Sequence, residues 1–191
     1  GKVAVAGATA VSNLMIDIRQ KLTELANSSI TASQRTIIQR DFTELVSQAA
    51  NFVSNATYNG FALLTSGAAT VNTLANLAGG QLSLTAQGNV KLFINSLAGA
   101  TTTTAANAQS VIVGQFNDLE TSVAQALGTL GAEVRALDLQ TGFLEELRDT
   151  TSVGLGNIVD ADLARESAKL TSQQIQQELS VQTLSIANTR P

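Results

Sequence analysis

The chain has neither cysteine nor histidine among its 191 residues, and it has no tryptophan. Without cysteine there is no disulfide and no thiolate nucleophile, and without histidine the commonest general base is missing. Zinc sites of the usual ligand sets are excluded for the same reason. Because only carboxylates, lysine, one tyrosine and hydroxyls remain for chemistry, we expect a protein that is not an enzyme and that has no metal and no cofactor.

Aromatic residues make up only 4% of the chain, although 44% of its residues are hydrophobic. Alanine, leucine, valine and isoleucine carry that share, which suits narrow helix seams better than a thick core around a ligand. No run of about 18 apolar residues is present, so we predict no membrane-spanning segment. The formal net charge is -4 and no basic stripe occurs, which argues against a nucleic-acid partner.

The first 60 residues have the pattern of two helices. Apolar residues at helical spacing predict a first helix over 3–27, and Thr31 with Gln34 forms a capping-box pattern that predicts the start of a second. So short a connection requires the helices to be antiparallel, which predicts an αα-hairpin over 1–60. The second helix is predicted to present a packing seam of Ile38, Phe42, Leu45 and Phe52.

A turn and a small β appendage are predicted next, over residues 61–104. Tyr58, Asn59 and Gly60 predict a tight hairpin turn before it, because Asn-Gly tolerates positive φ. Residues 81–86 alternate with period two and predict one strand, and residues 90–94 are interpreted as the second strand of the pair.

Residues 105–158 predict one long core helix. Its packing seam is predicted to include Ile112, Phe116, Leu119, Val123 and Leu137. A doubled spacing of four around Val123 and Leu127 predicts a stutter that locally relaxes the supercoil. Three glycines within the helix are interpreted as points of close backbone approach: Gly128, Gly131 and Gly142.

Gly154 and Gly156 are interpreted as a weak point, after which residues 159–191 predict a helical arm that depends on a partner. The predicted fold class is therefore mainly α. We expect an elongated antiparallel bundle of long helices with a small β-hairpin appendage and a C-terminal helical arm.

Two separated sets of residues resemble the conserved cores of bacterial flagellin, in the form seen in alphaproteobacteria. The first set comprises Ile18-Arg19, residues 25–27, Phe42, Asn51 and residues 58–64, and the second comprises residues 160–166 and 182–188. Together the likeness covers about residues 11–65 and 105–191.

This resemblance implies a structural subunit of the flagellar filament, secreted and used for swimming. The bundle would correspond to the D1 core of the family and residues 159–191 to part of its D0-like terminal region. The implied partners are copies of the chain itself, an export chaperone and cap proteins. The resemblance also implies a terminally truncated fragment that does not polymerise.

Three alternatives stay open at this stage: a hook-filament junction protein, a cell-surface protein that binds polysaccharide, and a coiled-coil spacer. The continuation at residues 58–64 disfavours the junction protein, and the few aromatic side chains disfavour sugar stacking. The adjacent carboxylates Glu145 and Glu146 fit a solvated helix face better than an acid-base pair.

The resemblance also implies a patch on the first two helices through which an innate immune receptor senses enteric flagellins. In this chain the patch falls on Asp17, Arg19, Lys21 and Asp41. Arg19 matches and Asp41 keeps the acidic character, but Asp17 stands where a base is expected and Lys21 where leucine is expected. We hypothesise that receptor signalling is weak or absent, because charge and apolar burial are both altered.

Overall fold

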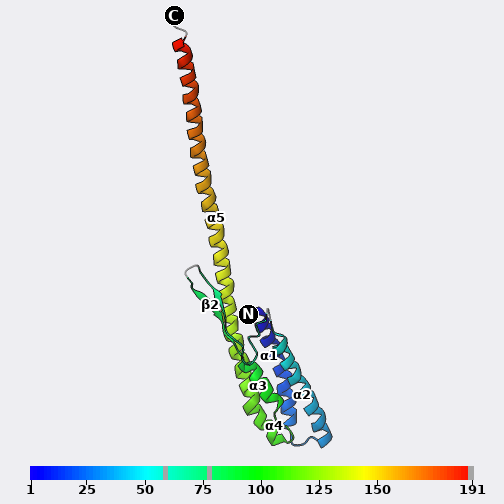
Figure 1. Cartoon of the computed structure of the whole chain (residues 1–191). Coiled ribbons are helices and arrows are strands. Elements are labelled where there is room, and N and C mark those ends of the chain that lie inside the picture. Colours follow the sequence, from blue (N-terminus) through cyan, green and yellow to red (C-terminus); the bar gives the residue numbers. More distant parts are fainter. Residues whose placement is uncertain (58–59, 77–78, 189–191) are drawn as a thin grey trace. The chain divides into compact units, whose positions relative to one another are not determined.

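The structure is a computed structural model that describes residues 1–57, 60–76 and 79–188. The chain divides into two compact units, Gly1–Gln140 and Thr141–Pro191. Their elements follow in the order α1 (Lys2–Leu25), α2 (Ala32–Asn55), β1 (Val71–Leu74), β2 (Gln81–Leu84), α3 (Asn89–Ala98), α4 (Ala105–Val111), the π-helical turn η1 (Ile112–Phe116) and α5 (Asn117–Asn188) (Figure 1). The predicted fold class, mainly helical with a small antiparallel hairpin and a long C-terminal helix, is confirmed.

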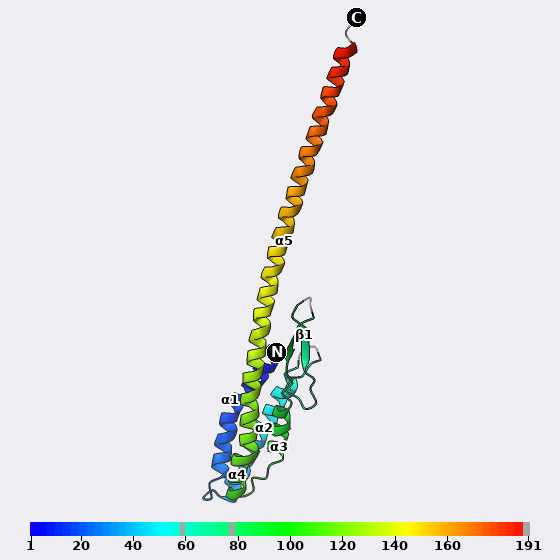
Figure 2. The same cartoon turned by 90° about the vertical axis from the view of Figure 1, so that its left-hand side faces the viewer.

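Helices α1 and α2 form the predicted αα-hairpin and pack side by side (Figures 1 and 2). Apart from the adjacent pair Gly7 and Ala8, the buried residues of α1 recur at spacings of three and four, which keeps them on one face of a helix. They are Ala4, Gly7, Ala8, Val11, Met15, Ile18, Leu22 and Leu25. On α2 the buried face comprises Phe42, Val46, Ala49 and Val53.

The connection between α1 and α2 is held by the polar groups that the sequence predicts. The Thr31 side chain accepts from the Gln34 backbone N–H, and the Gln34 side chain accepts from the Thr31 backbone N–H. This capping box satisfies donors that the first turn of a helix leaves free. At the end of α1, the Arg35 guanidinium donates to the carbonyl oxygens of Leu25 and Asn27 at 2.6 and 3.0 Å. Backbone polar groups at both ends of the short loop are therefore hydrogen-bonded.

The β appendage contains the predicted strand but pairs it with a different partner. Strand β2 pairs antiparallel with β1, which precedes it, with Val71 opposite Leu84. The prediction of a second strand at 90–94 is wrong, because these residues lie in α3. Val90, Ile94 and Leu97 are buried at spacings of four and three, so the apolar pattern has helical period once it is followed to Leu97.

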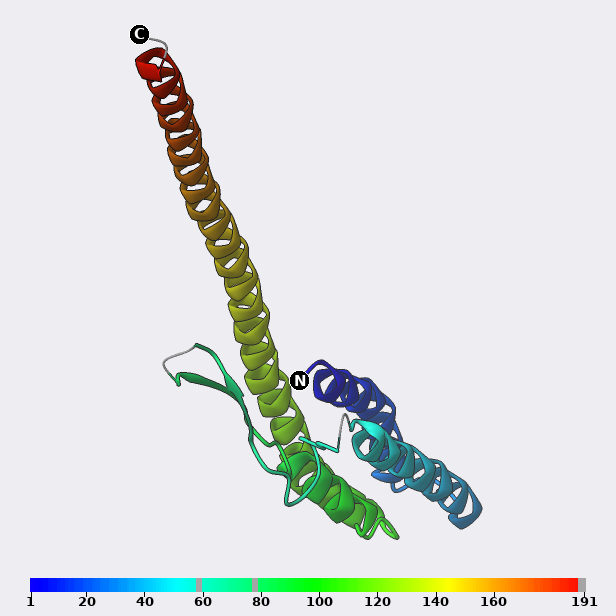
Figure 3. The ribbon, with the colours of Figure 1, turned by 45° about the horizontal axis from the view of Figure 1, so that its top comes forward.

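Two side chains of α5 hold the hairpin within the first unit, and the base of the hairpin lies beside the part of α5 that belongs to this unit (Figure 3). The Glu133 carboxylate accepts from the Thr85 backbone N–H at 2.8 Å and from Thr85 Oγ1 at 2.5 Å. The Gln140 amide donates to the carbonyl oxygen of Ala75 at 2.7 Å. Together these hydrogen bonds attach both strands of the hairpin to one helix.

The long helix departs from its predicted form in three places. The predicted helix from residue 105 is interrupted by the π turn η1, and α5 continues through Gly154 and Gly156, where a weak point was expected. The interpretation of Gly128, Gly131 and Gly142 as close approaches is also wrong, because a Cβ at each would meet no atom within 4 Å.

No described helix is both long and apolar enough to cross a membrane.

Candidate functional site

The predicted packing seam of α2 lies at the edge of the face that is buried. Phe42 is buried, whereas Ile38, Leu45 and Phe52 are partly buried and pack against the core. The centre of the contact is formed by Val46, Ala49 and Val53, which are at most 1% exposed. Periodicity identified the apolar side of α2, but its centre is set by the neighbours of the helix.

The predicted seam of the long helix is also shifted in part. Phe116, Leu119 and Val123 are buried, as is Leu130. Ile112 and Leu137 are only partly buried. Val111 and Ala126 occupy the buried positions beside Ile112 and Leu127, so the predicted stutter at 123–127 is absent and the helix is unwound instead at η1.

Two of the predicted turn residues, Tyr58 and Asn59, lie outside the described residues. Gly60 has a φ of 81°, a backbone conformation that glycine adopts without steric cost.

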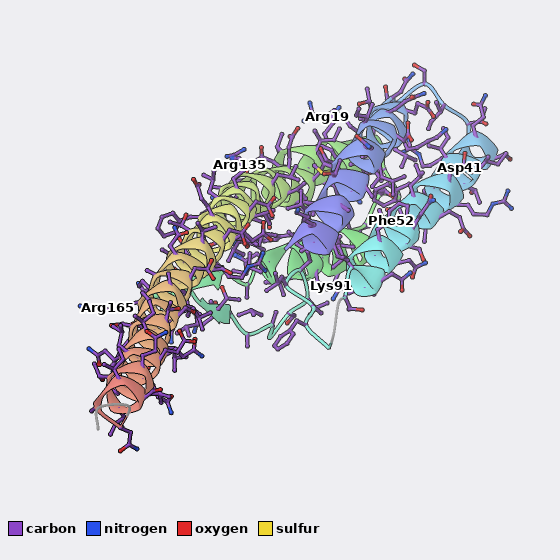
Figure 4. The ribbon with its side chains drawn as sticks, turned by 90° about the horizontal axis from the view of Figure 1, so that it is seen from above. Arg19, Asp41, Phe52, Lys91, Arg135 and Arg165 are labelled. Atoms are coloured by element: carbon purple, nitrogen blue, oxygen red, sulfur yellow. The ribbon has the colours of Figure 1, made fainter. Side chains whose placement is uncertain are left out.

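Arg19 of the predicted patch is engaged within the first unit. Its guanidinium lies 2.6 Å from the Glu120 carboxylate, and its Cζ lies 5.2 Å from the centre of the Phe116 ring. Arg19 extends from α1, whereas Asp41 extends from α2 (Figure 4). Sequence reasoning missed Glu120 as a partner, because the two residues are 101 positions apart and no local pattern connects them.

Lys21 and Asp41 are brought together by the αα-hairpin. Lys21 Nζ lies 3.3 Å from a carboxylate oxygen of Glu24 and 3.5 Å from one of Asp41. The hydrogen bond to Glu24 raises the pKa of Lys21 above 10.5, the attraction of both carboxylates adds to this rise, and desolvation partly offsets it. Both carboxylates therefore favour the charged form of the Lys21 side chain.

A groove of about 490 Å³ runs beside Arg19, between α1 and the first part of α5. It is lined by Ser12, Asn13, Met15, Ile16, Arg19, Phe116, Glu120, Val123, Ala124 and Leu127. Ile16 is 71% exposed at its edge. Among the described residues, no group of acidic side chains is arranged to hold a metal ion.

The described part of the second unit, residues 141–188, is entirely helical, and none of its side chains is buried. Its large apolar residues are nevertheless numerous. They include Phe143, Leu147, Val153, Ile158, Leu163, Leu170, Ile175, Leu179 and Leu184, each about half exposed or more. A helix with this composition is stabilised mainly by what packs against it, because isolated helices gain little in water.

A family model described as the bacterial flagellin C-terminal helical region matches residues 112–191. Flagellin FljM of Caulobacter vibrioides is 33% identical over 186 residues, covering 97% of this chain and 68% of the relative. The flagellin of Brucella melitensis is 31% identical over 183 residues, covering 90% of this chain and 64% of the relative. Sequence similarity therefore extends through both units.

The crystal structure of Bacillus cereus flagellin is similar with a TM-score of 0.63 at 18% identity, covering 72% of this chain and 79% of that chain. This likeness shows the fold, and the sequence matches place the chain in a class of structural proteins built from long helices. The chain belongs to the flagellin family, and the predicted alphaproteobacterial type is confirmed by its Caulobacter and Brucella relatives. It is a structural subunit of the bacterial flagellar filament.

Proposed function

We propose that the full-length subunit polymerises by side-by-side packing of its long helices, and that its role is structural and not catalytic. The observation that carries the proposal is the number of exposed apolar side chains along residues 141–188, which lie on several sides of the helix. Each such side chain contributes roughly 1.5–3 kcal/mol when it is fully buried. Copies of the same chain are the partner that a filament subunit meets at every contact. In this proposal residues 159–191 serve as the arm.

Polar replacements on the arm test this proposal. In the full-length protein, Leu163→Gln with Leu170→Gln should raise the critical concentration for seeded polymerisation at least about tenfold, because two apolar contacts are lost in every subunit. Gln keeps the helix propensity, and both leucines are more than 50% exposed, so helicity should not change. Sedimentation of filaments grown on seeds measures the effect.

The matched control is Ala164→Gln with Thr171→Gln, which are also seven positions apart and stand in a row at this spacing that carries no large apolar side chain over residues 160–182. This pair should leave the critical concentration unchanged. Unaltered polymerisation of the leucine variant would contradict the proposed use of the arm.

We also propose that the chain is secreted before it assembles, with an export chaperone and cap proteins as partners. The absence of cysteine supports this, because a crosslinked chain would not pass an export channel unfolded. Association of the chain with a chaperone before export, measured by pull-down with a flagellar chaperone of the same bacterium, would test the partner assignment.

For the immune-receptor patch, we propose weak activation. Lys21 is held by Glu24 and Asp41, and Arg19 is held by Glu120, so two cations of the patch are already paired. Receptor reporter cells should need roughly 100-fold more of this protein than of an activating enteric flagellin, since opposed charge and lost apolar contact each weaken binding.

The double variant Asp17→Arg with Lys21→Leu should activate the receptor at a concentration at least about tenfold lower than the unchanged chain needs, because it restores charge and apolar contact. Asp118→Asn in α5 makes the same net charge change as the double variant, since Asp17→Arg adds two positive charges and Lys21→Leu removes one, and this control should not recover activity. Strong activation by the unchanged chain in the same titration would refute the hypothesis.

A further inference from the structure

The helix that runs through α4, η1 and the first part of α5 contains one residue more than its packing requires. Ala108 and Leu130 are both fully buried and lie 22 residues apart, one more than three heptads. The structure accommodates the additional residue in the π turn η1, where the buried residues Val111 and Phe116 are five positions apart. On either side of this turn the buried apolar positions recur at spacings of three and four.

The same stretch contains a second complete apolar seam. Its spacings are four, four and three, repeated twice, which is the 11-residue repeat of an evenly wound helix with no π turn. Its members are Ala108, Ile112, Phe116, Leu119, Val123, Leu127 and Leu130. Every member is hydrophobic, and this seam uses all 22 positions without any interruption.

The two seams differ at only two places. The observed seam buries Val111 and Ala126, at 3% and 0% exposure, whereas Ile112 and Leu127 are partly buried. The second seam would bury Ile112 and Leu127 in their place. An adjacent pair of apolar side chains stands at both positions, so either winding removes hydrophobic surface from water.

We propose that the helix from Ala105 to Leu130 is a two-state element with two windings. One is the observed form with the π turn, and the other is an evenly wound α-helix that buries Ile112 and Leu127. Phe116 belongs to both seams and stays beneath Arg19. The change alters the outer surface, because Leu127 lines the groove beside Arg19 and Glu120 in the observed winding and enters the core in the other. Single π turns within helices are frequent at functional positions.

Replacing Ala126 by a polar residue distinguishes a helix that has only the observed winding from a helix that can adopt both. If only the observed winding exists, Ala126→Gln places an amide in the core. If both exist, the helix rewinds, Leu127 enters the core and the introduced amide moves to the edge. We expect Ala126→Gln to lower the melting temperature of the first unit by about 3 °C or less, against about 10 °C for a polar residue kept in the core.

Ala108→Gln is the matched control, because Ala108 is equally buried, lies in the same stretch and belongs to both seams. It should show the full decrease of about 10 °C. Equal decreases for Ala126→Gln and Ala108→Gln would overturn the proposal.

Deletion of Gly114 removes the additional residue and leaves only the heptad seam. A Cβ at Gly114 would meet no atom within 4 Å, so no packing is lost, and the deletion variant should melt at or above the original temperature. In the deletion variant, Ala126→Gln should lower the melting temperature as much as Ala108→Gln does. A mild effect of Ala126→Gln in both backgrounds, or failure of the deletion variant to fold, would overturn the proposal.

Hydrogen exchange gives an independent measurement on the unaltered chain. Amides of residues 112–116 should exchange at least about tenfold faster than those of residues 119–123, because rewinding breaks the hydrogen bonds of the π turn. After deletion of Gly114 the difference should disappear. Equal exchange in both regions of the unaltered chain would contradict the second winding.

Discussion

Replacing Phe116 by alanine should lower the free energy of unfolding of the first unit by about 4 kcal/mol, the range observed for large-to-small changes at buried aromatic positions. Phe116 is 1% exposed and is one of the largest fully buried side chains of the core. Its removal leaves a cavity at the point where η1 joins α5, and it also removes the ring beneath Arg19. Both losses lower the free energy of unfolding.

Urea unfolding followed by circular dichroism measures this change. Phe143→Ala is the matched control, since Phe143 is 59% exposed in the second unit. It should change the free energy of unfolding by no more than about 0.5 kcal/mol, as exposed substitutions usually do. Similar losses for the two variants would show that Phe116 does not occupy the core position described above.

Gly7→Ala should destabilise the first unit by about 2–3 kcal/mol, although alanine is the better helix former. A Cβ at position 7 would lie 2.5 Å from the Cβ of Ala56 and 3.2 Å from Cδ1 of Leu64. The Cβ of Ala56 is fixed to its backbone, so α1 and the end of α2 would have to move apart.

Combining Gly7→Ala with Ala56→Gly should recover most of the stability, because the second change removes the atom that clashes. Gly128→Ala provides the control, since its Cβ would meet no atom within 4 Å. It should stabilise the chain by about 0.5–1 kcal/mol through helix propensity. Opposite signs for the two Gly→Ala variants in urea unfolding are the expected result, and a stabilising Gly7→Ala would refute the close contact.

Helix starts and connections were predictable because their signals are local. The capping box of Thr31 and Gln34 lies within four residues, and the structure contains both of its hydrogen bonds. The strand at 81–84 was also predicted from alternation, but its partner was not. A five-residue window could not distinguish a strand from a helix at 90–94, because the helical period becomes visible only when Leu97 is included.

The predicted receptor patch shows a second limit of prediction from the sequence. Asp17, Arg19 and Lys21 could be placed on one helix from their spacing, but not the partners that engage them. Glu120 reaches Arg19, and Asp41 reaches Lys21, only after the helices pack.

The residues in their order were enough to establish the flagellin resemblance, the helical hairpin and the apolar side of each long helix, since capping and periodicity are properties of neighbouring residues. Tertiary packing determines that Val111 and Ala126 are buried, whereas the adjacent residues Ile112 and Leu127 are only partly buried. It also paired β2 with β1 and requires glycine at position 7. These outcomes depend on contacts between segments distant in the chain, where adjacent apolar residues fit the same local pattern and only the shape of the opposing surface distinguishes them.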